Sequence, residues 1–139
     1  MRNLNNFAIK LRKSGLRPTK QRLKICEVLF TPEKTYHFTI NDLTKIIEEK
    51  LNEKISLATV YNTVHAFKEK GYLKEIFISS DKSYFDTNTS SHHHFFDVRG
   101  KELIDIELNK IELKNIPNPP KGKSIKDIDV VINVENDSQ

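Results

Sequence analysis

The sequence predicts an α+β protein, in which an N-terminal winged helix-turn-helix is followed by a small α/β dimerisation domain. Apolar residues recur at helical spacing as far as Gly71, and alternation of apolar and polar residues begins directly after it. Residues 1–82 contain 16 Lys or Arg and 9 Asp or Glu, a net charge of +7, whereas residues 83–139 contain 7 and 10, a net charge of −3. These changes of period and charge predict two domains, residues 1–87 and 88–139.

Two helices are predicted at the N-terminus. The first spans residues 4–14 and ends at Gly15, because glycine readily adopts the left-handed conformation that stops a helix. Thr19 can accept a backbone N–H bond at the start of the second helix, which extends to Phe30. Pro32 cannot continue that helix, so the chain is expected to leave it there.

A third helix is expected from Thr39 to about Leu51. Asp42 follows Thr39 at the spacing of a capping box, in which each side chain accepts a bond from the other residue's backbone N–H. Residues 36–38, just before this helix, are expected to form a loop.

Residues 55–71 are predicted to form the helix around which the first domain is organised. Ser56 is suited to cap its start and Gly71 to end it. Its apolar stripe consists of Leu57, Val60, Val64 and Phe67. Its other face carries small, aromatic or hydrogen-bonding side chains and no acid, namely Ala58, Thr59, Tyr61, Asn62, His65 and Lys68.

A β-hairpin is predicted after that helix. Residues 72–79 and 84–87 form its strands, and a polar turn at residues 80–83 joins them. The last three of these helices, at residues 19–30, 39–51 and 55–71, followed by a hairpin make a winged helix-turn-helix, in which the last helix enters the major groove while the wing and the basic leader touch phosphates. This order favours a recognition helix at residues 55–71 over a merely solvated amphipathic helix. Residues 87–91 form a polar joint between the domains.

The second domain is predicted to contain strands at residues 94–98 and 102–106, a charged helical segment at residues 107–115 and a longer strand at residues 125–134. A half-polar strand of this kind can pair with its copy across a two-fold axis. We therefore expect a homodimer, and its interface candidates are the alternate apolar residues Ile128, Val130 and Ile132.

Composition excludes several classes of protein. No apolar stretch approaches the roughly 20 residues of a membrane span, and residues 1–6 lack the apolar core of a signal peptide. A cytoplasmic protein without membrane association is therefore expected. Cys26, the single cysteine, cannot form a disulfide within the chain and is expected in the core.

Double-stranded DNA is the partner that the first domain predicts. The first 24 residues contain eight Lys or Arg and no Asp or Glu, which indicates a polyanion. Asn62 could bond adenine N6 and N7 together, and the Tyr61 ring could lie on a thymine methyl group. His65 by itself is more typical of a surface histidine. The candidate DNA contacts are Arg17, Lys20, Thr59, Tyr61, Asn62 and His65.

Three consecutive histidines are the candidate ligand-binding group of the second domain. On a strand, His92 and His94 would point to one face and His93 to the other, so all three cannot bind one ion. His92 and His94 joined by His37 and Asp86 would supply three imidazoles and a carboxylate, a set suited to Fe²⁺, Mn²⁺ or Zn²⁺. His37 alone is more often a loop or capping residue than a metal ligand.

Haem is the alternative ligand for this histidine run. One of the imidazoles of His92, His93 or His94 could be an axial ligand, and the neighbouring Phe95 and Phe96 could cover a porphyrin face. Spacing alone leaves haem and a divalent ion both open.

Several motifs resemble the ferric uptake regulator family of bacterial repressors, across nearly the whole chain. The similar segments are Gly15-Leu16-Arg17-Pro18-Thr19-Lys20-Gln21-Arg22, Ala58-Thr59-Val60-Tyr61, and Tyr84-Phe85-Asp86 followed by the histidine run. Within the family, residues 61–65, 92–96, 117–120 and 129–132 look most like the iron response regulator subgroup of α-proteobacteria. That resemblance implies a dimeric repressor of iron-responsive genes, which acts when iron is scarce and is released by haem.

The chain also departs from the family pattern. Most members have Arg where this chain has Asn62, which implies a different operator preference. Both Cys-x-x-Cys pairs are missing, so a structural zinc site with four cysteine ligands is excluded. Phe95 and Phe96 replace an Asp and a further His, and Ile128 replaces a late His, so an ordinary ion site has lost donors and haem is favoured.

Other functions fit the same residues. One alternative within the family is an iron, manganese, zinc or peroxide sensor that does not use haem. A metal-dependent hydrolase is a distant alternative, because no general base, oxyanion loop or glycine-rich phosphate cradle accompanies the histidines. An adaptor that binds only protein is disfavoured by the basic leader. No catalytic residues are expected.

Overall fold

A computed structural model of the chain describes residues 4–138, so Arg2 of the basic leader lies outside the described residues. The chain divides into two compact units, the first ending at Thr89 and the second beginning at Ser90. Among residues 4–138, no helix combines the length and the apolar character that crossing a membrane requires.

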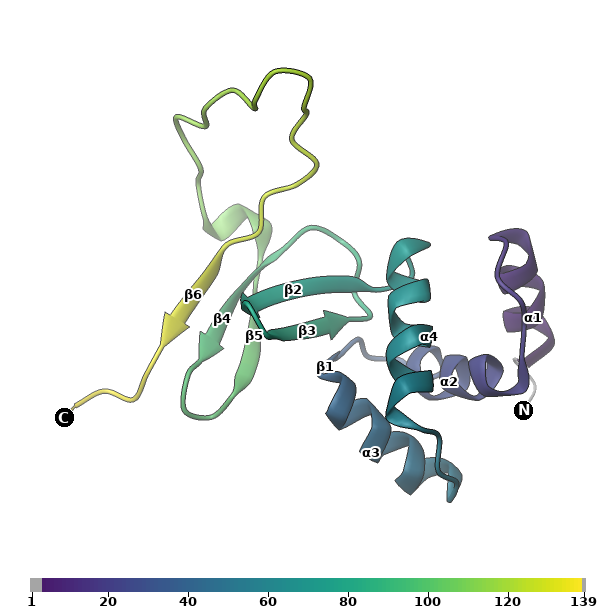
Figure 1. Ribbon diagram of the computed structural model, residues 1–139. Helices are drawn as coiled ribbons and strands as arrows, with labels where there is room; N and C mark the ends of the chain where they lie inside the picture. The colour runs from purple at the N-terminus through teal and green to yellow at the C-terminus, as the bar shows by residue number, and fades with distance from the viewer. Residues whose placement is uncertain (1–3, 139) are drawn as a thin grey trace. The chain divides into compact units, whose positions relative to one another are not determined.

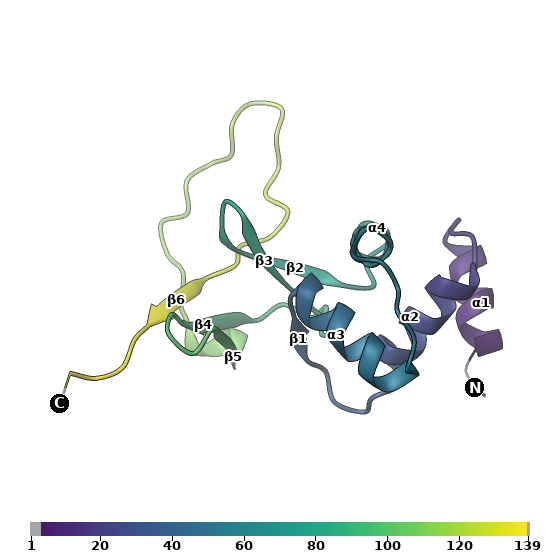
Figure 2. The same cartoon turned by 60° about the horizontal axis from the view of Figure 1, so that its bottom comes forward.

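Four helices form most of the first unit, and their bounds are α1 Leu4–Lys13, α2 Lys20–Phe30, α3 Ile40–Leu51 and α4 Leu57–Glu69 (Figure 1). Helix α2 contacts each of the other three, and α3 also contacts α4. Figure 2 views α4 nearly along its axis, with α3 beside it. Their shared core is built from apolar side chains that include Leu11, Ile25, Leu29, Leu43, Ile47, Val60, Val64 and Phe67.

The predicted helix ends are confirmed. Thr19 and Ser56 cap α2 and α4 by accepting bonds from the backbone N–H groups of Arg22 and Thr59. Thr39 and Asp42 form both bonds of the capping box at the start of α3. After α4, Gly71 has a φ of 79°, a conformation that glycine adopts without the strain that a Cβ would cause.

The buried stripe of α4 differs from the predicted one at two positions. Leu57 was predicted to be buried but is 51% exposed, whereas Thr63 is only 3% exposed. Leu57 is the first residue of α4, and the helix meets the core from Val60 onward. The stripe that packs on the other helices is therefore Val60, Thr63, Val64 and Phe67.

The hairpin that follows α4 is confirmed as β2 (Lys74–Ser79) and β3 (Lys82–Asp86). The prediction of a loop at residues 36–38 was wrong in part, because β1 (His37–Phe38) pairs with the other edge of β3. Two residues are too few to produce an alternating pattern, so this strand exists only through its partner. The sheet has the order β1-β3-β2 and is antiparallel throughout.

The second unit contains a three-stranded sheet of order β5-β4-β6. Its strands are β4 (His93–Asp97), β5 (Glu102–Ile106) and β6 (Val131–Val134), drawn from green to yellow in Figure 1. Strand β5 is antiparallel to β4, whereas β6 runs parallel to it.

Two predictions for this unit were wrong. The expected helix at residues 107–115 is only a single 3-10 turn, η1 (Leu108–Lys110), because a short helix without a surface to pack on is not stable. The expected strand at residues 125–134 is limited to β6, because a ladder extends only where its partner β4 offers free backbone groups. Ile128 and Val130 therefore precede the strand on which they were placed.

Candidate nucleic-acid interface and metal ligands

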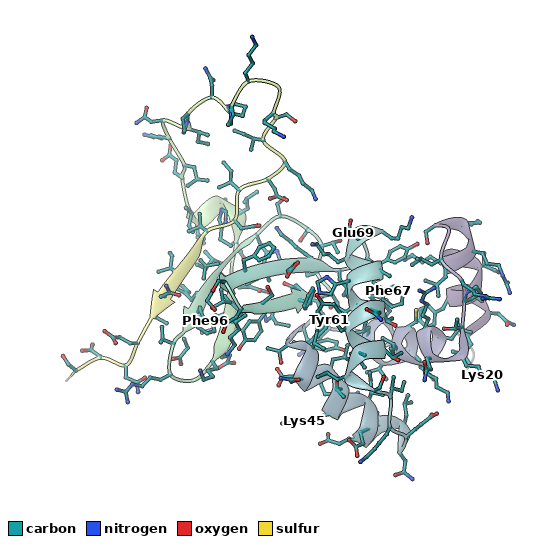
Figure 3. All side chains as sticks on the ribbon, viewed as in Figure 1. Lys20, Lys45, Tyr61, Phe67, Glu69 and Phe96 are labelled. Atoms are coloured by element: carbon teal, nitrogen blue, oxygen red, sulfur yellow. The ribbon has the colours of Figure 1, made fainter. Side chains whose placement is uncertain are left out.

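The outer face of α4 presents polar and aromatic side chains to solvent. Tyr61 is 51% exposed, and Asn62 and Ala58 are also exposed. In Figure 3, the labelled Tyr61 and Phe67 lie on different sides of α4, and Phe67 belongs to the buried core. Tyr61 and Asn62 are therefore free to approach another molecule while the opposite face anchors the helix.

The other residues expected on this face are engaged in contacts of their own. The hydroxyl of Thr59 accepts a bond from the Ser56 hydroxyl at 2.9 Å, at the cap of α4. Lys68 Nζ lies 3.0 Å from Glu75 Oε1 on β2, and this hydrogen bond raises the pKa of Lys68. The Lys68 charge is thus compensated within the protein, contrary to its predicted place on a free face.

His65 is half-buried and lies among aromatic rings. Its ring centroid is 4.2 Å from that of Tyr61, one helical turn earlier. On its other side, it is 5.5 Å from the ring of Phe85 on β3, in an edge-on arrangement. His65 therefore stands between the exposed tyrosine and the buried sheet.

The turn before α2 holds exposed cations close to the start of that helix. Arg17 and Lys20 are both exposed. The guanidinium of Arg22 donates to the backbone oxygen of Arg17 at 3.0 Å, while the Arg22 backbone N–H bonds the Thr19 cap. Cationic side chains thus project from a turn whose backbone is fixed by hydrogen bonds.

His37 and Asp86 form a close pair in the first unit. They lie opposite each other in the register of β1 and β3, and His37 Nε2 is 3.3 Å from Asp86 Oδ2. Asp86 is almost completely buried, and its other oxygen accepts the backbone N–H of Asn88 at 2.8 Å. A carboxylate and an imidazole are therefore already held together.

His92, His94 and Asp105 form a cluster in the second unit. Each offers one ligand atom, and these atoms lie within 4.8 Å of one another. Asp105 Oδ1 is 3.4 Å from His92 Nε2 and 3.3 Å from His94 Nε2. The two imidazole rings have centroids 4.5 Å apart. As predicted, His92 and His94 point to the same side, and the carboxylate of Asp105 faces both of them.

A backbone carbonyl sets the tautomer of neutral His92. Its Nδ1 lies 2.7 Å from the backbone oxygen of Ser90, which can only accept, so Nδ1 carries the hydrogen. Nε2 then bears a lone pair that faces the carboxylate of Asp105 at 3.4 Å. Two acceptors at this distance repel unless a proton or a metal cation lies between them. Histidines that bind metal usually donate their other ring N–H to a carbonyl or carboxylate in this way.

His93 is not brought into this cluster. Its Nδ1 accepts the backbone N–H of Val130 at 3.1 Å, which ties β4 to the chain just before β6. His93 is 2% exposed and lies on the sheet face opposite to His94. The structure thus gives His93 a structural contact and separates it from its two neighbours.

Asp105 is the residue that sequence reasoning missed. It lies directly opposite His94 in the register of β4 and β5. The signal was present, because a hairpin whose loop contains Gly100 pairs residue 97 with 102 and hence 94 with 105. Asp105 was overlooked because the two strands were predicted without a register.

Cys26 is confirmed as a core thiol. It is 2% exposed, and burial raises its pKa to about 12. The thiolate that would bind metal or react with an oxidant is therefore not formed at neutral pH.

Comparison with known proteins places these features in context. Residues 13–133 match the ferric uptake regulator family. The chain is 41% identical over 111 residues to the ferric uptake regulation protein of Shigella flexneri, covering 79% of this chain and 72% of that protein. It is 31% identical over 102 residues to the peroxide-responsive repressor PerR of Staphylococcus epidermidis, covering 73% of this chain and 66% of the relative.

A solved structure has a similar fold. The ferric uptake regulator from Pseudomonas aeruginosa with manganese superimposes with a TM-score of 0.66 at 25% sequence identity. The match covers 91% of this chain and 95% of that one.

Proposed function

Because the chain belongs to the ferric uptake regulator family, we propose that it is a metal-responsive transcription regulator that binds double-stranded DNA. Residues 1–87 bind the DNA, and residues 88–139 form the dimer and sense the ligand. The observation that carries the proposal is the exposed pair Tyr61 and Asn62 on α4, within a half of net charge +7. The metal-dependent hydrolase is discarded, because the family consists of regulators.

In this proposal, α4 lies in the major groove of the DNA. The amide of Asn62 bonds the N6 and N7 edge of an adenine, and the Tyr61 ring contacts a thymine methyl group. Arg17 and Lys20 contact phosphates, which position the protein but carry no sequence information. The fixed turn at Arg17 supports this role, because its cations are presented from an ordered backbone.

Binding to a duplex that the protein has selected from a random-sequence pool tests this proposal. Tyr61→Ala and Asn62→Ala should each weaken binding by about 1–3 kcal/mol and leave binding to a scrambled duplex nearly unchanged. Arg17→Ala should weaken binding to both duplexes and reduce the salt dependence. Asn118→Ala, at an exposed asparagine of the second unit, is the matched control. If Asn62→Ala left the preference for the selected duplex intact, its base-reading role would be wrong.

We propose that the sensed ligand is a divalent ion of iron, manganese or zinc, held by His92, His94 and Asp105. Two imidazoles and a carboxylate suit these ions, and the approach of Nε2 of both His92 and His94 to one oxygen of Asp105 supports a shared cation there. The manganese in the Pseudomonas aeruginosa relative supports the same class of ion. A Lewis-acidic ion would hold the two strands of the β4–β5 hairpin together through these side chains.

His37 and Asp86 are proposed as further ligands of the same ion. Only five residues separate Asp86 from His92 in the chain. His37 and Asp86 would add an imidazole and a carboxylate to the three donors of the cluster. An ion shared in this way would favour one arrangement of the two units, and it can shift DNA affinity only by its differential affinity for that arrangement. His37→Ala should then lower the affinity for Mn²⁺, as measured by calorimetry, with His65→Ala as the control.

Control by haem is the second candidate, as the resemblance to the iron response regulator subgroup implies. What supports it is the Phe95 and Phe96 pair that follows the histidines, of which Phe95 is half-buried. The contacts of His92 and His94 with Asp105 favour an ion instead. Metal and haem analysis of protein purified without chelator separates the two ligands. A Soret band lost in the double variant His92→Ala with His94→Ala would favour haem.

A peroxide response is the third signal to test, because one relative is named a peroxide-responsive repressor. Adding hydrogen peroxide to the iron-loaded and the manganese-loaded protein, with DNA binding as the readout, tests this directly. Release of DNA from the iron-loaded protein alone would assign the peroxide signal.

A homodimer is part of the proposal, because a helix that reads a palindrome needs a second copy at least one DNA turn away. The register of the second sheet places Ile104, Phe95 and Ile132 side by side in one row. Ile104 and Ile132 are 47% and 39% exposed. This row, rather than the predicted set of Ile128, Val130 and Ile132, is the proposed centre of the interface.

A further inference from the structure

We infer that His65 and Phe85 are positioning residues, whose rings hold Tyr61 in place for DNA. The inference rests on the proposed DNA binding and adds two residues that act through Tyr61. It also reassigns His65, which the sequence suggested as a direct DNA contact.

Four rings form a continuous series from the solvent to the core, which we call the ring ladder: Tyr61, His65, Phe85 and Phe38. The first two centroids are 4.2 Å apart, the next two 5.5 Å and the last two 6.0 Å. These are contact distances for packed aromatic rings, whose edges and faces attract each other. Each ring in the ladder is therefore held by the next.

The buried end of the ladder is rigid. Phe85 and Phe38 are 2% and 1% exposed, and they lie opposite each other in the register of β3 and β1. Their rings are stacked with an interplanar angle of 25°. Because the interior is close-packed, the Phe85 ring offers His65 a fixed surface to lean on.

The exposed end of the ladder needs such support. Tyr61 is 51% exposed, so without a neighbour its ring would exchange between rotamers in solvent. A ring that is already ordered loses less conformational entropy when it binds. Contact with His65 therefore orders the Tyr61 ring before it enters the major groove. This ordering should raise the affinity for the selected sequence more than the affinity for other DNA.

The position of His65 fits a support better than a base contact. It is half-buried, with the Tyr61 ring centroid at 4.2 Å and the Phe85 ring centroid at 5.5 Å, the latter in an edge-to-face arrangement. Its contribution through ring contact does not require its nitrogen atoms. A phenylalanine at position 65 should therefore preserve the support, whereas it would abolish any hydrogen bond to a base.

Substitutions at positions 65 and 85 test the inference with two duplexes, one selected by the wild-type protein from a random-sequence pool and the other its scrambled counterpart. The readout is the dissociation constant for the scrambled duplex divided by the dissociation constant for the selected duplex. Both His65→Ala and Phe85→Leu should lower this ratio by about 3- to 10-fold, the effect of losing one ring contact. His65→Phe should keep it within about 2-fold of the wild-type ratio.

Phe30→Leu is the matched control for a loss of packing. The Phe30 ring contacts Phe67 on the buried side of α4 at 6.0 Å, away from Tyr61. This variant should lower the melting temperature, as Phe85→Leu also should, and leave the ratio unchanged. The double variant Tyr61→Ala with His65→Ala should have the same ratio as Tyr61→Ala alone, because the support has nothing left to hold.

Two outcomes would overturn the inference alone. If His65→Phe lowered the ratio as much as His65→Ala does, His65 would act on DNA through its nitrogens. If Phe85→Leu and Phe30→Leu had equal effects on the ratio, the ladder would be ordinary packing. A wild-type protein that selected no duplex would instead overturn the proposed function, and the inference with it.

Discussion

His94 and Asp105 face each other across the β4–β5 hairpin, with His94 Nε2 at 3.3 Å from Asp105 Oδ1. The same carboxylate oxygen lies 3.4 Å from His92 Nε2. Asp105 is thus the residue that makes two neighbouring histidines into a three-donor cluster.

Asp105→Ala should weaken Mn²⁺ binding by at least about tenfold, because the ion loses one carboxylate ligand and the negative charge that faces both His92 and His94. Isothermal titration calorimetry on the metal-free protein measures this affinity. Glu102→Ala removes an acidic residue from the same strand but lies on the other face of the sheet, opposite Asp97, and should leave the affinity unchanged. Equal losses of Mn²⁺ affinity in the two variants would mean that the affinity depends on net charge and not on the position of the carboxylate.

His93→Ala should destabilise the protein without weakening Mn²⁺ binding. His93 accepts the backbone N–H of Val130, and removing it leaves that group without its acceptor at a cost of about 1–3 kcal/mol. Thermal unfolding monitored by circular dichroism measures the stability. A loss of Mn²⁺ affinity comparable to that of His94→Ala would make His93 a ligand, as the sequence suggested.

Leu43→Ala and Leu57→Ala should have very different effects on stability. Leu43 is 0% exposed, and its truncation should cost about 2–5 kcal/mol in the free energy of unfolding. Leu57 is half-exposed, so the same change should cost less than about 1 kcal/mol. Urea denaturation of both variants checks this. Similar losses in the free energy of unfolding would mean that Leu57 is buried, as the sequence predicted.

Features encoded by neighbouring residues could be predicted from the sequence. The caps at Thr19, Thr39 and Ser56 depend on residues within one turn, and each is present. The period change after Gly71 likewise placed the hairpin correctly. Local chemistry thus accounts for most of the first unit.

Features that depend on distant partners could not be predicted in the same way. Strand β1 exists because β3 pairs with it, and β6 is short because β4 is short. Asp105 joins His94 only through strand register, and His93 finds its partner in Val130, far along the chain. The sequence shows which residue types could bind a metal, but strand pairing decides which of these residues lie together in the candidate cluster.

Ile104→Asp combined with Ile132→Asp should shift the protein from dimer to monomer. Both side chains are exposed and flank Phe95 in the same row of the sheet, so two carboxylates there would oppose burial against a second copy. Sedimentation velocity at micromolar concentration measures the change. Asp in place of Ile125, which is also exposed but lies outside the sheet, is the control. A wild-type protein that was already monomeric without DNA would contradict the proposed dimer.

The most direct test of the central claim is a fluorescence anisotropy titration of one labelled duplex, selected by the wild-type protein, with metal-free and with Mn²⁺-loaded protein. The account predicts that the two dissociation constants differ by about tenfold, that chelator reverses the difference, and that Asp105→Ala abolishes it. Identical affinities in both states, with Mn²⁺ binding confirmed by calorimetry in the same buffer, would contradict regulation by a metal ion.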